Sequence, residues 1–589
     1  MKVSVDFCVV GGGIAGLCAA VAAARHGATV ALVQDRSVLG GNASSEIRMH
    51  ICGAHGSNRR ETGIVEELFL DNLRYNSSAS WPIFDTVLWS KVRAEKNIRL
   101  FLDSSVSSGT VENGRLRSVR AWQTTTEEWI EIEAKLFADC SGDSVLAPIS
   151  GAAFRWGREG RDEFGESEAP EKPDSCTMGN SILLQAMEFP TEQPFTPFPW
   201  AYDYSAPENR EWLNGRWCDI THTNLWWIEV GGVGDCIKDT AEHRDELLKI
   251  CYGVWDYVKN HAPDKERWRN FGLEWVGSLP GKRESRRYEG DHMMTQREVQ
   301  EGGRFEDIVA YGGWSIDNHY PEGFYHRGEG TKYTGCPSPF GIPFRSLYSR
   351  NVPNLLFAGR NISCSHVAMS ATRVMATCGL EGQAIGIAAA IAVRDGLEPR
   401  AIYETRIEEL QRTLQDDDCW IPGKLREVRG VCANAKLEGA GEGVERLRDG
   451  MERDYDDGEH GWRAPFGSAA TYLFEAPVDL HEIRLVFDSD LNRADKGRPH
   501  GTSYDSIKQG RFFRALGDPC YCPPKTLVRD FRIEVSFGSG EWVSAAEVKD
   551  NFQRLVRIPV EGKNVKGLRL VPLSAWGATE AHVFAFDAR

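Results

Sequence analysis

The sequence predicts an α/β chain that carries an inserted α+β domain and ends in an all-β sandwich. An apolar run, a glycine-rich turn and an alanine-rich run open the chain, and a second apolar run followed by an Ala/Gly-rich run returns at residues 353–393. After about residue 425, short alternating segments separated by turns indicate antiparallel strands. We therefore expect residues 1–150 and 346–415 to form one α/β domain, with residues 151–345 inserted in it as an α+β domain. Residues 416–424 are the expected linker, and residues 425–589 the sandwich.

Size and charge limit the classes of protein to consider. A chain of 589 residues is too long for one hydrophobic core and predicts roughly three or four domains. Hydrophobic residues make up 41% and charged residues 26%, which is typical of globular proteins. The formal net charge is −16 and no Lys/Arg stripe with interleaved aromatic residues occurs, which argues against a nucleic-acid or anionic-membrane partner.

Cysteine usage and the first residues bear on the compartment. The 15 cysteines are scattered without C-x-x-C pairs, a pattern that fits reduced thiols and a cytoplasmic location. Asp6 and three consecutive glycines interrupt the apolar opening. We therefore expect neither a targeting segment nor insertion in a membrane.

The N-terminal segment "VSVDFCVVGGGIAGLCAAVAAARHGATVALVQD" carries the strongest motif. A strand from Val3 to Val10 precedes the G-x-G-x-x-G pattern of Gly11, Gly13 and Gly16, a helix runs to about His26, and a second strand follows from Thr29 to Val33. In this context Gly11 makes the tight turn, Gly13 lets the backbone approach a pyrophosphate, and Gly16 lets the helix pack on the strand. The pattern predicts a Rossmann-type dinucleotide-binding unit with phosphate at the helix N-terminus.

The end of the second strand departs from the usual pattern. An acidic residue normally binds the ribose hydroxyls there, but Gln34 occupies that place and Asp35 follows it. Either side chain can accept a hydrogen bond from a ribose hydroxyl, so both are candidate cofactor contacts.

Three later segments are informative because of their order along the chain. Leu39–Gly41 read "LGG", Phe137–Ser144 read "FADCSGDS", and a strand ending at Gly359 leads through a polar turn to a helix from about Leu380 to Val393. With the first motif, this order resembles FAD-dependent oxidoreductases with a glutathione-reductase-type FAD domain. The resemblance implies FAD as the cofactor. It makes the following residues cofactor contacts: Gly41, Val106, Gly142, Asp143, Gly359, Arg360, Gly379 and Gln383.

A finer resemblance covers residues 1 to about 415. The segments "WWIEVGG", "LPGKRESRRYEGDHMM", "YGGWSIDNHYPEG" and "HVAMSATRVMATC" are similar to a family labelled simply FAD-dependent oxidoreductase, whose members commonly occur among carbohydrate-utilisation genes. This resemblance implies a saccharide-like small molecule as substrate.

The segment "GGNASSEIRMHICGAHG" at residues 40–56 follows the "LGG" turn directly. In related flavoproteins a polar segment runs beneath the pyrophosphate and along the flavin ring at this point, which makes Asn42, Ser44, Ser45, Glu46 and Arg48 expected cofactor contacts. His50 is expected in the wall of the cofactor pocket and is also a candidate substrate contact. Two other interpretations stay open: a metal site that uses His50, Cys52 and His55, and covalent flavin attachment through His50 or Cys52. No second group of ligands with matching spacing occurs, so we predict no metal.

Polar and aromatic residues of the inserted region are candidates for substrate contacts. "THTNLWWIEVGG" predicts a strand with Trp226 and Trp227 on opposite faces, and "LEWVGSLPGKRESRRYEGDHMM" predicts two strands around a Pro-Gly turn. An aromatic plate beside polar donors suits a sugar ring, and an arginine with a carboxylate suits a hydroxyl-rich or anionic ligand. The predicted substrate contacts are Trp227, Arg283, Trp314 and Asp317.

Four residues are candidates for catalysis. His366 lies seven residues after Gly359, where the resemblance places residues against the flavin, and a histidine can remove an alcohol proton as hydride leaves for the flavin. His319 is the rival base. Arg286 and Arg373 would polarise a carboxylate substrate.

Residues 425–589 contain a start segment, "RLRDGMERDYDDGEHGWRA", that resembles a discoidin-like, galactose-binding-type β-sandwich. Such modules bind glycans or support a neighbouring domain, and we favour support.

The resulting functional prediction is an FAD-dependent enzyme that passes a hydride between a carbohydrate or polyol carbon and flavin N5. Only one strand–G-x-G-x-x-G–helix unit occurs, so a two-nucleotide-domain reductase is disfavoured and the electron acceptor stays unknown. The alternatives are a fumarate-reductase-like enzyme acting on C=C bonds of a carboxylate and a non-catalytic, flavin-containing glycan-binding protein.

Overall fold

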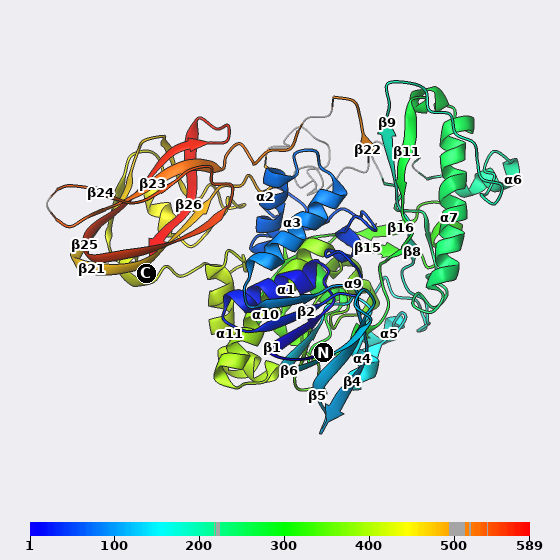
Figure 1. Cartoon of the computed structure of the whole chain (residues 1–589), viewed down its shortest axis with the longest axis horizontal. Coiled ribbons are helices and arrows are strands. Elements are labelled where there is room, and N and C mark those ends of the chain that lie inside the picture. Colours follow the sequence, from blue (N-terminus) through cyan, green and yellow to red (C-terminus); the bar gives the residue numbers. More distant parts are fainter. Residues whose placement is uncertain (217, 220–223, 494–512, 518–519, 539) are drawn as a thin grey trace. The chain divides into compact units, whose positions relative to one another are not determined.

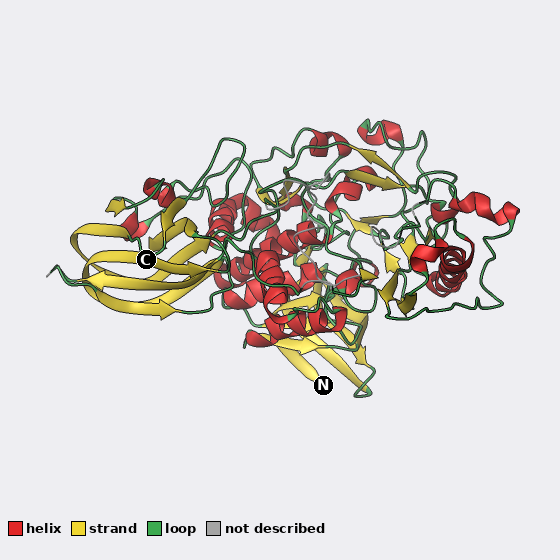
Figure 2. Cartoon of the chain, turned by 90° about the horizontal axis from the view of Figure 1, so that it is seen from above, coloured by secondary structure: helices red, strands yellow, loops and turns green. Residues whose placement is uncertain are grey.

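The structure is a computed structural model that describes residues 1–216, 218–219, 224–493, 513–517, 520–538 and 540–589. The chain divides into two compact units. The first comprises Met1–Gly53, Ser78–Leu410 and Lys508–Cys520, and the second comprises Ala54–Ser77, Gln411–Ile507 and Tyr521–Arg589. The first unit mixes helices and strands, whereas the second consists mainly of strands (Figure 2).

The first unit contains a seven-stranded sheet (Figure 1). Its strand order is β3-β2-β1-β6-β5-β4, with β18 paired to β6. Strands β1, β2, β3, β6 and β18 are mutually parallel, while β4 and β5 form an antiparallel extension. The bounds are β1 Lys2–Val10, β2 Val30–Val33, β3 Ile98–Phe101, β4 Ser104–Glu112, β5 Arg115–Gln123, β6 Glu128–Asp139 and β18 Leu355–Phe357. This sheet confirms the predicted Rossmann-type domain and the return of the later segment to it.

Two helices pack closely together beside this sheet, α1 (Ile14–Arg25) and α10 (Met375–Asp395). Glycines allow the approach: a Cβ atom on Gly382 would lie 2.0 Å from the Ala15 carbonyl oxygen, and one on Gly386 would lie 2.3 Å from that of Ala19. Among the described residues, α10 is the one helix long and apolar enough to cross a membrane. The window that meets this test is 94% buried within the protein, as in a core helix.

The remaining helices range from one turn to several turns in length. In the first unit they are α3 Trp81–Ala94, α4 Leu146–Ser150, α5 Arg161–Phe164, α6 Pro207–Arg210, α7 Thr240–Asp256, α8 Gln296–Gln300 and α9 His366–Thr372. Helix α11 (Pro399–Asp416) follows α10 along the chain, and α2 (Ile64–Tyr75) belongs to the second unit.

The inserted region is built from small sheets instead of one large sheet, and it has the expected α+β character. Its sheets pair β8 with β10 and β12, β9 with β11 and β22, β7 with β13, β14 with β17, and β15 with β16. The bounds are β7 Phe154–Arg155, β8 Asn180–Ser181, β9 Leu184–Glu188, β10 Glu229–Val230, β11 Phe271–Val276, β12 Gly281–Lys282, β13 Arg287–Tyr288, β14 Ile308–Gly312, β15 Ile316–His319, β16 Thr331–Thr334, β17 Phe340–Pro343 and β22 Phe513–Arg514.

One strand prediction in this region is wrong. Trp226 and Trp227 lie in a turn, and strand β10 begins only at Glu229. Leu225 has a left-handed backbone with φ of 56°, and its carbonyl accepts the Ile228 N–H at 3.0 Å. The turn that this bond closes prevents an extended run through the two tryptophans.

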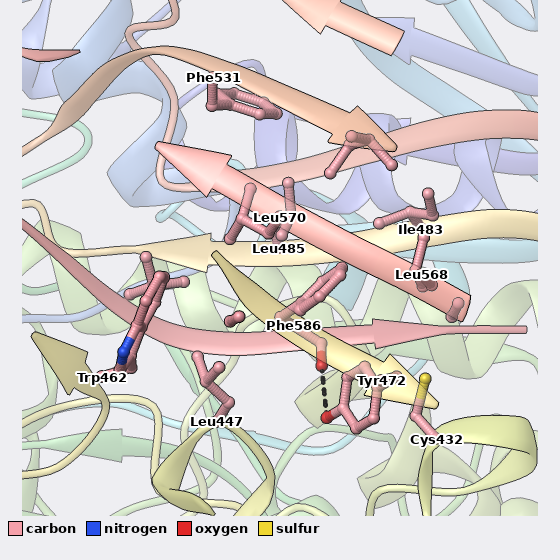
Figure 3. Close-up of a cluster of buried hydrophobic side chains, with 14 of the residues drawn as sticks. Cys432, Leu447, Trp462, Tyr472, Ile483, Leu485, Phe531, Leu568, Leu570 and Phe586 are labelled. Carbon is pink, nitrogen blue, oxygen red and sulfur yellow. Dashed lines mark hydrogen bonds between the residues drawn. The ribbon is translucent and has the colours of Figure 1, made fainter. Parts of the chain in front are cut away.

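The second unit is an antiparallel β-sandwich, as predicted. Its strand order is β20-β26-β21-β25-β23-β24, with β19 paired to β21. The bounds are β19 Lys436–Gly439, β20 Trp462–Pro465, β21 Ala470–Phe487, β23 Val528–Ser536, β24 Val543–Val548, β25 Leu555–Ala575 and β26 Glu580–Ala588. Figure 3 shows its core, in which Trp462, Tyr472 and Phe586 are buried and the Tyr472 hydroxyl donates to the Phe586 carbonyl at 2.9 Å.

Candidate functional site

A cavity of about 400 Å³ opens at the carboxyl ends of the parallel strands in the first unit. Val10, Val33 and Gly359, at or just after the ends of β1, β2 and β18, line it. In open parallel sheets this edge is where nucleotide ligands bind. The sequence-predicted residues that line the cavity are Gly11, Gly13, Gln34, Asp35, Gly41, Asn42, His50, Val106, Gly142, Asp143, Arg283, Gly359, Arg360 and Arg373.

The glycine-rich turn shapes the floor of this cavity. Gly11 has a φ of +102°, and a Cβ atom there would lie 2.4 Å from the Cys140 backbone. A Cβ atom on Gly13, in contrast, would meet nothing closer than the Gly41 α-carbon at 4.0 Å, so Gly13 faces open space. Gly13 is also the N-cap of α1 and no side chain caps that helix, which leaves its first N–H groups available to an anion.

The two candidate ribose residues have different roles in the structure. The Gln34 side-chain oxygen accepts the Gly12 N–H at 2.7 Å, so this amide fixes the glycine turn. Asp35 keeps its carboxylate 64% exposed at the cavity edge. Asp35 is therefore the more accessible acceptor for a ribose hydroxyl.

A half-buried carboxylate organises the cations beside the cavity. Asp143 accepts from Lys282 Nζ at 2.7 Å and from Arg360 at 2.8 Å. Burial alone would raise the pKa of Asp143, but Arg360 and Lys282 outweigh it and hold this pKa at about 2. The Arg360 Nε–H is buried and has no hydrogen-bond partner among the described groups, although the residue lines the cavity.

These features fit the FAD implied by the sequence. A dinucleotide pyrophosphate needs a glycine turn without side chains, free helix N–H groups and a cation, and the cavity offers Gly13, the uncapped α1 and Arg360. The donor that Arg360 leaves unused is of the type that a phosphate oxygen would satisfy.

The segment at residues 40–56 contributes only some of its side chains to the cavity. Asn42, His50 and Cys52 line it, and the Asn42 amide donates to the Lys282 carbonyl at 3.0 Å. Burial lowers the pKa of His50 to about 4, so its imidazole is neutral at ordinary pH. No group of three or more metal-ligating side chains occurs among the residues that the structure describes.

Three neighbours in the same segment lie outside the lining. The Ser45 N–H donates to Asp85 at 2.9 Å, and Glu46 accepts from Arg36 at 3.3 Å. Arg48 donates to the Gln185 side chain at 2.6 Å and lies over the Trp275 ring at 4.4 Å. These three residues thus contact other parts of the first unit.

His319 belongs to a buried network next to the cavity. Its Nδ1 lies 2.6 Å from Glu229 and its Nε2 lies 3.4 Å from Asp317, so both ring nitrogens face carboxylates. Arg283 pairs with Glu229 at 3.3 Å, and Arg373 pairs with Asp317 at 3.1 Å. Burial would raise the pKa of Asp317, but His319 and Arg373 lower it below its ordinary value.

His366 belongs to a second buried network. Its Nδ1 lies 2.9 Å from Glu284, its Nε2 lies 3.1 Å from the Asn318 side-chain oxygen, and its backbone N–H donates to Glu159 at 2.8 Å. Arg287 lies between the two acids, 3.1 Å from Glu284 and 3.0 Å from Glu159. His366 is 1% exposed and lies outside the cavity lining.

The other predicted residues are not among those that line the cavity. Arg286 donates to the Asp143 carbonyl at 3.0 Å, Trp227 stacks on Phe324, and the Trp314 Nε1–H points to Asp317 at 3.5 Å. Gly16, Gly379 and Gln383 are buried within α1 and α10.

Comparison with known proteins decides the family. A model described as FAD dependent oxidoreductase matches residues 6–414, well over half of the chain. The chain belongs to the FAD-dependent oxidoreductase family. It is accordingly an enzyme, and its cofactor is FAD. No curated protein matches the chain.

Solved structures that match this oxidoreductase are distant. A geranylgeranyl bacteriochlorophyll reductase-like protein from Thermoplasma acidophilum is 12% identical, with 71% of this chain and 85% of that chain covered and a TM-score of 0.32. The OxyS anhydrotetracycline hydroxylase from Streptomyces rimosus is 12% identical over 70% of each chain, with a TM-score of 0.31. A family 32 carbohydrate-binding module of EndoD from Streptococcus pneumoniae is 14% identical, with 27% and 99% covered and a TM-score of 0.20.

The oxidoreductase also uses residues that the sequence interpretation missed. Lys282 lines the cavity. The Pro280–Gly281 turn before it brings the chain close to the Ile47 side chain, from which a Cβ atom on Gly281 would lie only 2.8 Å away. Met375 and Cys378, one helical turn apart at the start of α10, line it too. The Pro-Gly turn in the sequence could have pointed to Lys282 as a cavity residue. Met375 and Cys378 give no such signal, because they look like ordinary core positions in the sequence.

Proposed function

We propose that this FAD-dependent oxidoreductase moves a hydride between a hydroxyl-bearing carbon of a carbohydrate or polyol and FAD. The observation that carries the proposal is that His50 lines the same cavity as Ser181, Arg283 and Arg373, which bring a hydroxyl and two cations. A neutral base among hydrogen-bond donors suits a polyhydroxylated substrate. Bound FAD supplies the two-electron acceptor.

His50 is the proton acceptor in this proposal. Of the histidines that the structure describes, it alone lines the cavity. Its Nδ1 lies 3.4 Å from the Asn224 side-chain nitrogen. For Nε2 to take the substrate proton, Nδ1 must carry the hydrogen, and the Asn224 amide must turn over so that its oxygen, not its nitrogen, faces Nδ1.

Anaerobic titration of the FAD-loaded enzyme tests the proposal. Aldoses, glycosides and polyols are added in turn, and loss of the visible flavin absorbance is recorded. At least one of them should bleach the flavin. If no saccharide or polyol does so while pre-reduced enzyme is reoxidised by an α,β-unsaturated carboxylate, the proposal fails in favour of C=C reduction.

A further inference from the structure

The hairpin of β15 and β16 presents different residues on its two faces. In its register Asp317 is opposite Tyr333, and His319 is opposite Thr331. Directly opposite residues of an antiparallel pair share a face, and so do residues two apart along one strand. Asp317, His319, Thr331 and Tyr333 therefore share one face, which we call the inner face, and Asn318 and Lys332 lie on the other.

Contacts of these side chains fit this assignment. On the inner face the Thr331 hydroxyl donates to Asp317 at 2.6 Å. On the other face Asn318 meets His366, and the Lys332 ammonium lies 2.6 Å from Glu168. The two histidine networks thus lie on opposite sides of a single hairpin.

The Asp317–Arg373 ion pair and the Glu229 carboxylate, which bridges His319 and Arg283, connect the inner face to the cavity wall. Asp317 pairs with Arg373 at 3.1 Å, while Glu229 lies 2.6 Å from His319 and 3.3 Å from Arg283. Both arginines line the cavity. Tyr333, directly across from Asp317, lies on this same face of the hairpin, although it is not among the residues that line the cavity.

The Tyr333 side chain is only partly buried. Its residue is 56% exposed, yet the hydroxyl interacts electrostatically with Asp317, Arg373, Cys52 and Arg283. No hydrogen bond to that hydroxyl occurs among the residues that the structure describes. Burial of the hydroxyl end raises its pKa above the ordinary value, so the phenol keeps its proton and stays a donor.

We propose that Tyr333 covers the mouth of the cavity at its Arg283–Arg373 end, where its hydroxyl donates a hydrogen bond to the substrate and its ring lies against the substrate's apolar face. A saccharide has both features, apolar ring faces and a rim of hydroxyl acceptors. The part of this inference that concerns the substrate rests on the proposed function. The part that concerns access to the cavity does not.

Three variants of the FAD-loaded enzyme test the inference: Tyr333→Phe, Tyr333→Ala and Lys332→Ala. The last is the matched control, since it changes the next residue on the same strand but on the opposite face. The first readout needs no substrate: the rate constant for reduction of bound FAD by dithionite. Tyr333→Ala should be reduced faster than wild type, while Tyr333→Phe and Lys332→Ala should match wild type.

The second readout is steady-state kinetics with a sugar that reduces the wild type. Tyr333→Phe should raise KM by about 3- to 10-fold with little change in kcat, the scale of one lost hydrogen bond to bound substrate. Unchanged dithionite rates in Tyr333→Ala overturn the covering role, and an unchanged KM in Tyr333→Phe overturns the hydrogen bond. If no sugar reduces the wild type, the proposed function and the hydrogen bond fail together, while the dithionite rates still decide the covering role.

Discussion

Gly16 faces the carbonyl oxygen of Gly11 so closely that a Cβ atom on Gly16 would lie 1.8 Å from that oxygen. The contact joins the start of α1 to the turn that follows β1, and both partners are backbone. The helix therefore sits on the strand only because residue 16 has no side chain.

Gly16→Ala should consequently damage the fold itself. The added methyl group must push α1 away from the turn, at a cost of about 3 kcal/mol, the upper end for overpacking. Urea unfolding of the flavin-free protein measures this loss. Gly335→Ala is the control, because nothing lies within 4 Å of a Cβ atom there. Equal stability of the two variants would contradict the packing role of Gly16.

Gly13→Val should act in a different way. Its side chain would enter open space above α1, where the fit with FAD requires the pyrophosphate, so the fold should survive while the flavin is lost. The ratio of visible flavin absorbance to protein absorbance reports FAD retention, and urea unfolding reports the fold. A yellow Gly13→Val protein would remove Gly13 from the cofactor site.

The Rossmann-type unit and the sandwich could be predicted because their signals are local. The glycine spacing, the apolar strands and the alternating segments each lie within a few tens of residues. The site was less predictable, because its partners are distant in sequence: Glu284 lies 82 residues from His366, and Glu229 lies 90 residues from His319. No local pattern in the sequence reveals that His366 and His319 have carboxylate partners. Nor does one reveal that His50 lines the cavity.

His50→Asn tests the choice of base. The variant should retain FAD but bleach with its sugar substrate about 10²- to 10⁴-fold more slowly, the usual scale for losing a general base. His366→Asn, the matched control, should bleach at nearly the wild-type rate, because both His366 nitrogens already contact Glu284 and Asn318. A slow His366→Asn beside a normal His50→Asn would return the role to His366.

The pH profile of the same half-reaction gives an independent check. Burial lowers the pKa of His50 from 6.5 to about 4, so the neutral, proton-accepting form persists as the pH falls. The wild-type bleaching rate should stay level between about pH 7 and pH 5 and decline only as pH approaches 4. A decline centred near 6.5 would show that another histidine is the base.

Asp85 should make the stability of the first unit depend on pH. Burial raises the pKa of this carboxyl from 3.8 to about 6, although the hydrogen bond from Ser45 acts to lower it. The folded pKa lies above the unfolded pKa, so the folded state binds this proton more tightly. The resulting contribution to the free energy of unfolding is fully present below pH 3.8 and is lost as the pH rises through 6.

Asp85→Asn removes that titration while its amide oxygen still accepts the Ser45 N–H. Relative to wild type, the variant should gain about 2 kcal/mol between pH 4 and pH 7. Urea unfolding at a series of pH values measures the difference, and Asp162→Asn, an exposed position on α5, serves as control. A constant difference across this range would contradict an elevated pKa for Asp85.

Residues 54–77 belong to the second unit although they precede its other residues by more than 300 positions. Leu70 of α2 lies in the core of the sandwich. Arg453, 2% exposed, donates to the carbonyl oxygens of Asn58 and Arg60 at 3.1 and 3.0 Å and to the Thr62 hydroxyl at 3.0 Å. The first part of the chain thus contains a segment that only the sandwich can bury.

Deletion of residues 425–589 should therefore give an insoluble protein. The truncation leaves residues 54–77 in the chain but removes Arg453 and the apolar core around Leu70, so an apolar helix face becomes exposed. Sedimentation of the expressed truncation, compared with full-length protein, measures solubility. Arg453→Ala in the full-length chain should reproduce part of the defect, since it leaves two buried carbonyl groups without their donor. Soluble, FAD-loaded 1–424 would instead identify the sandwich as an independent module and favour glycan binding over support.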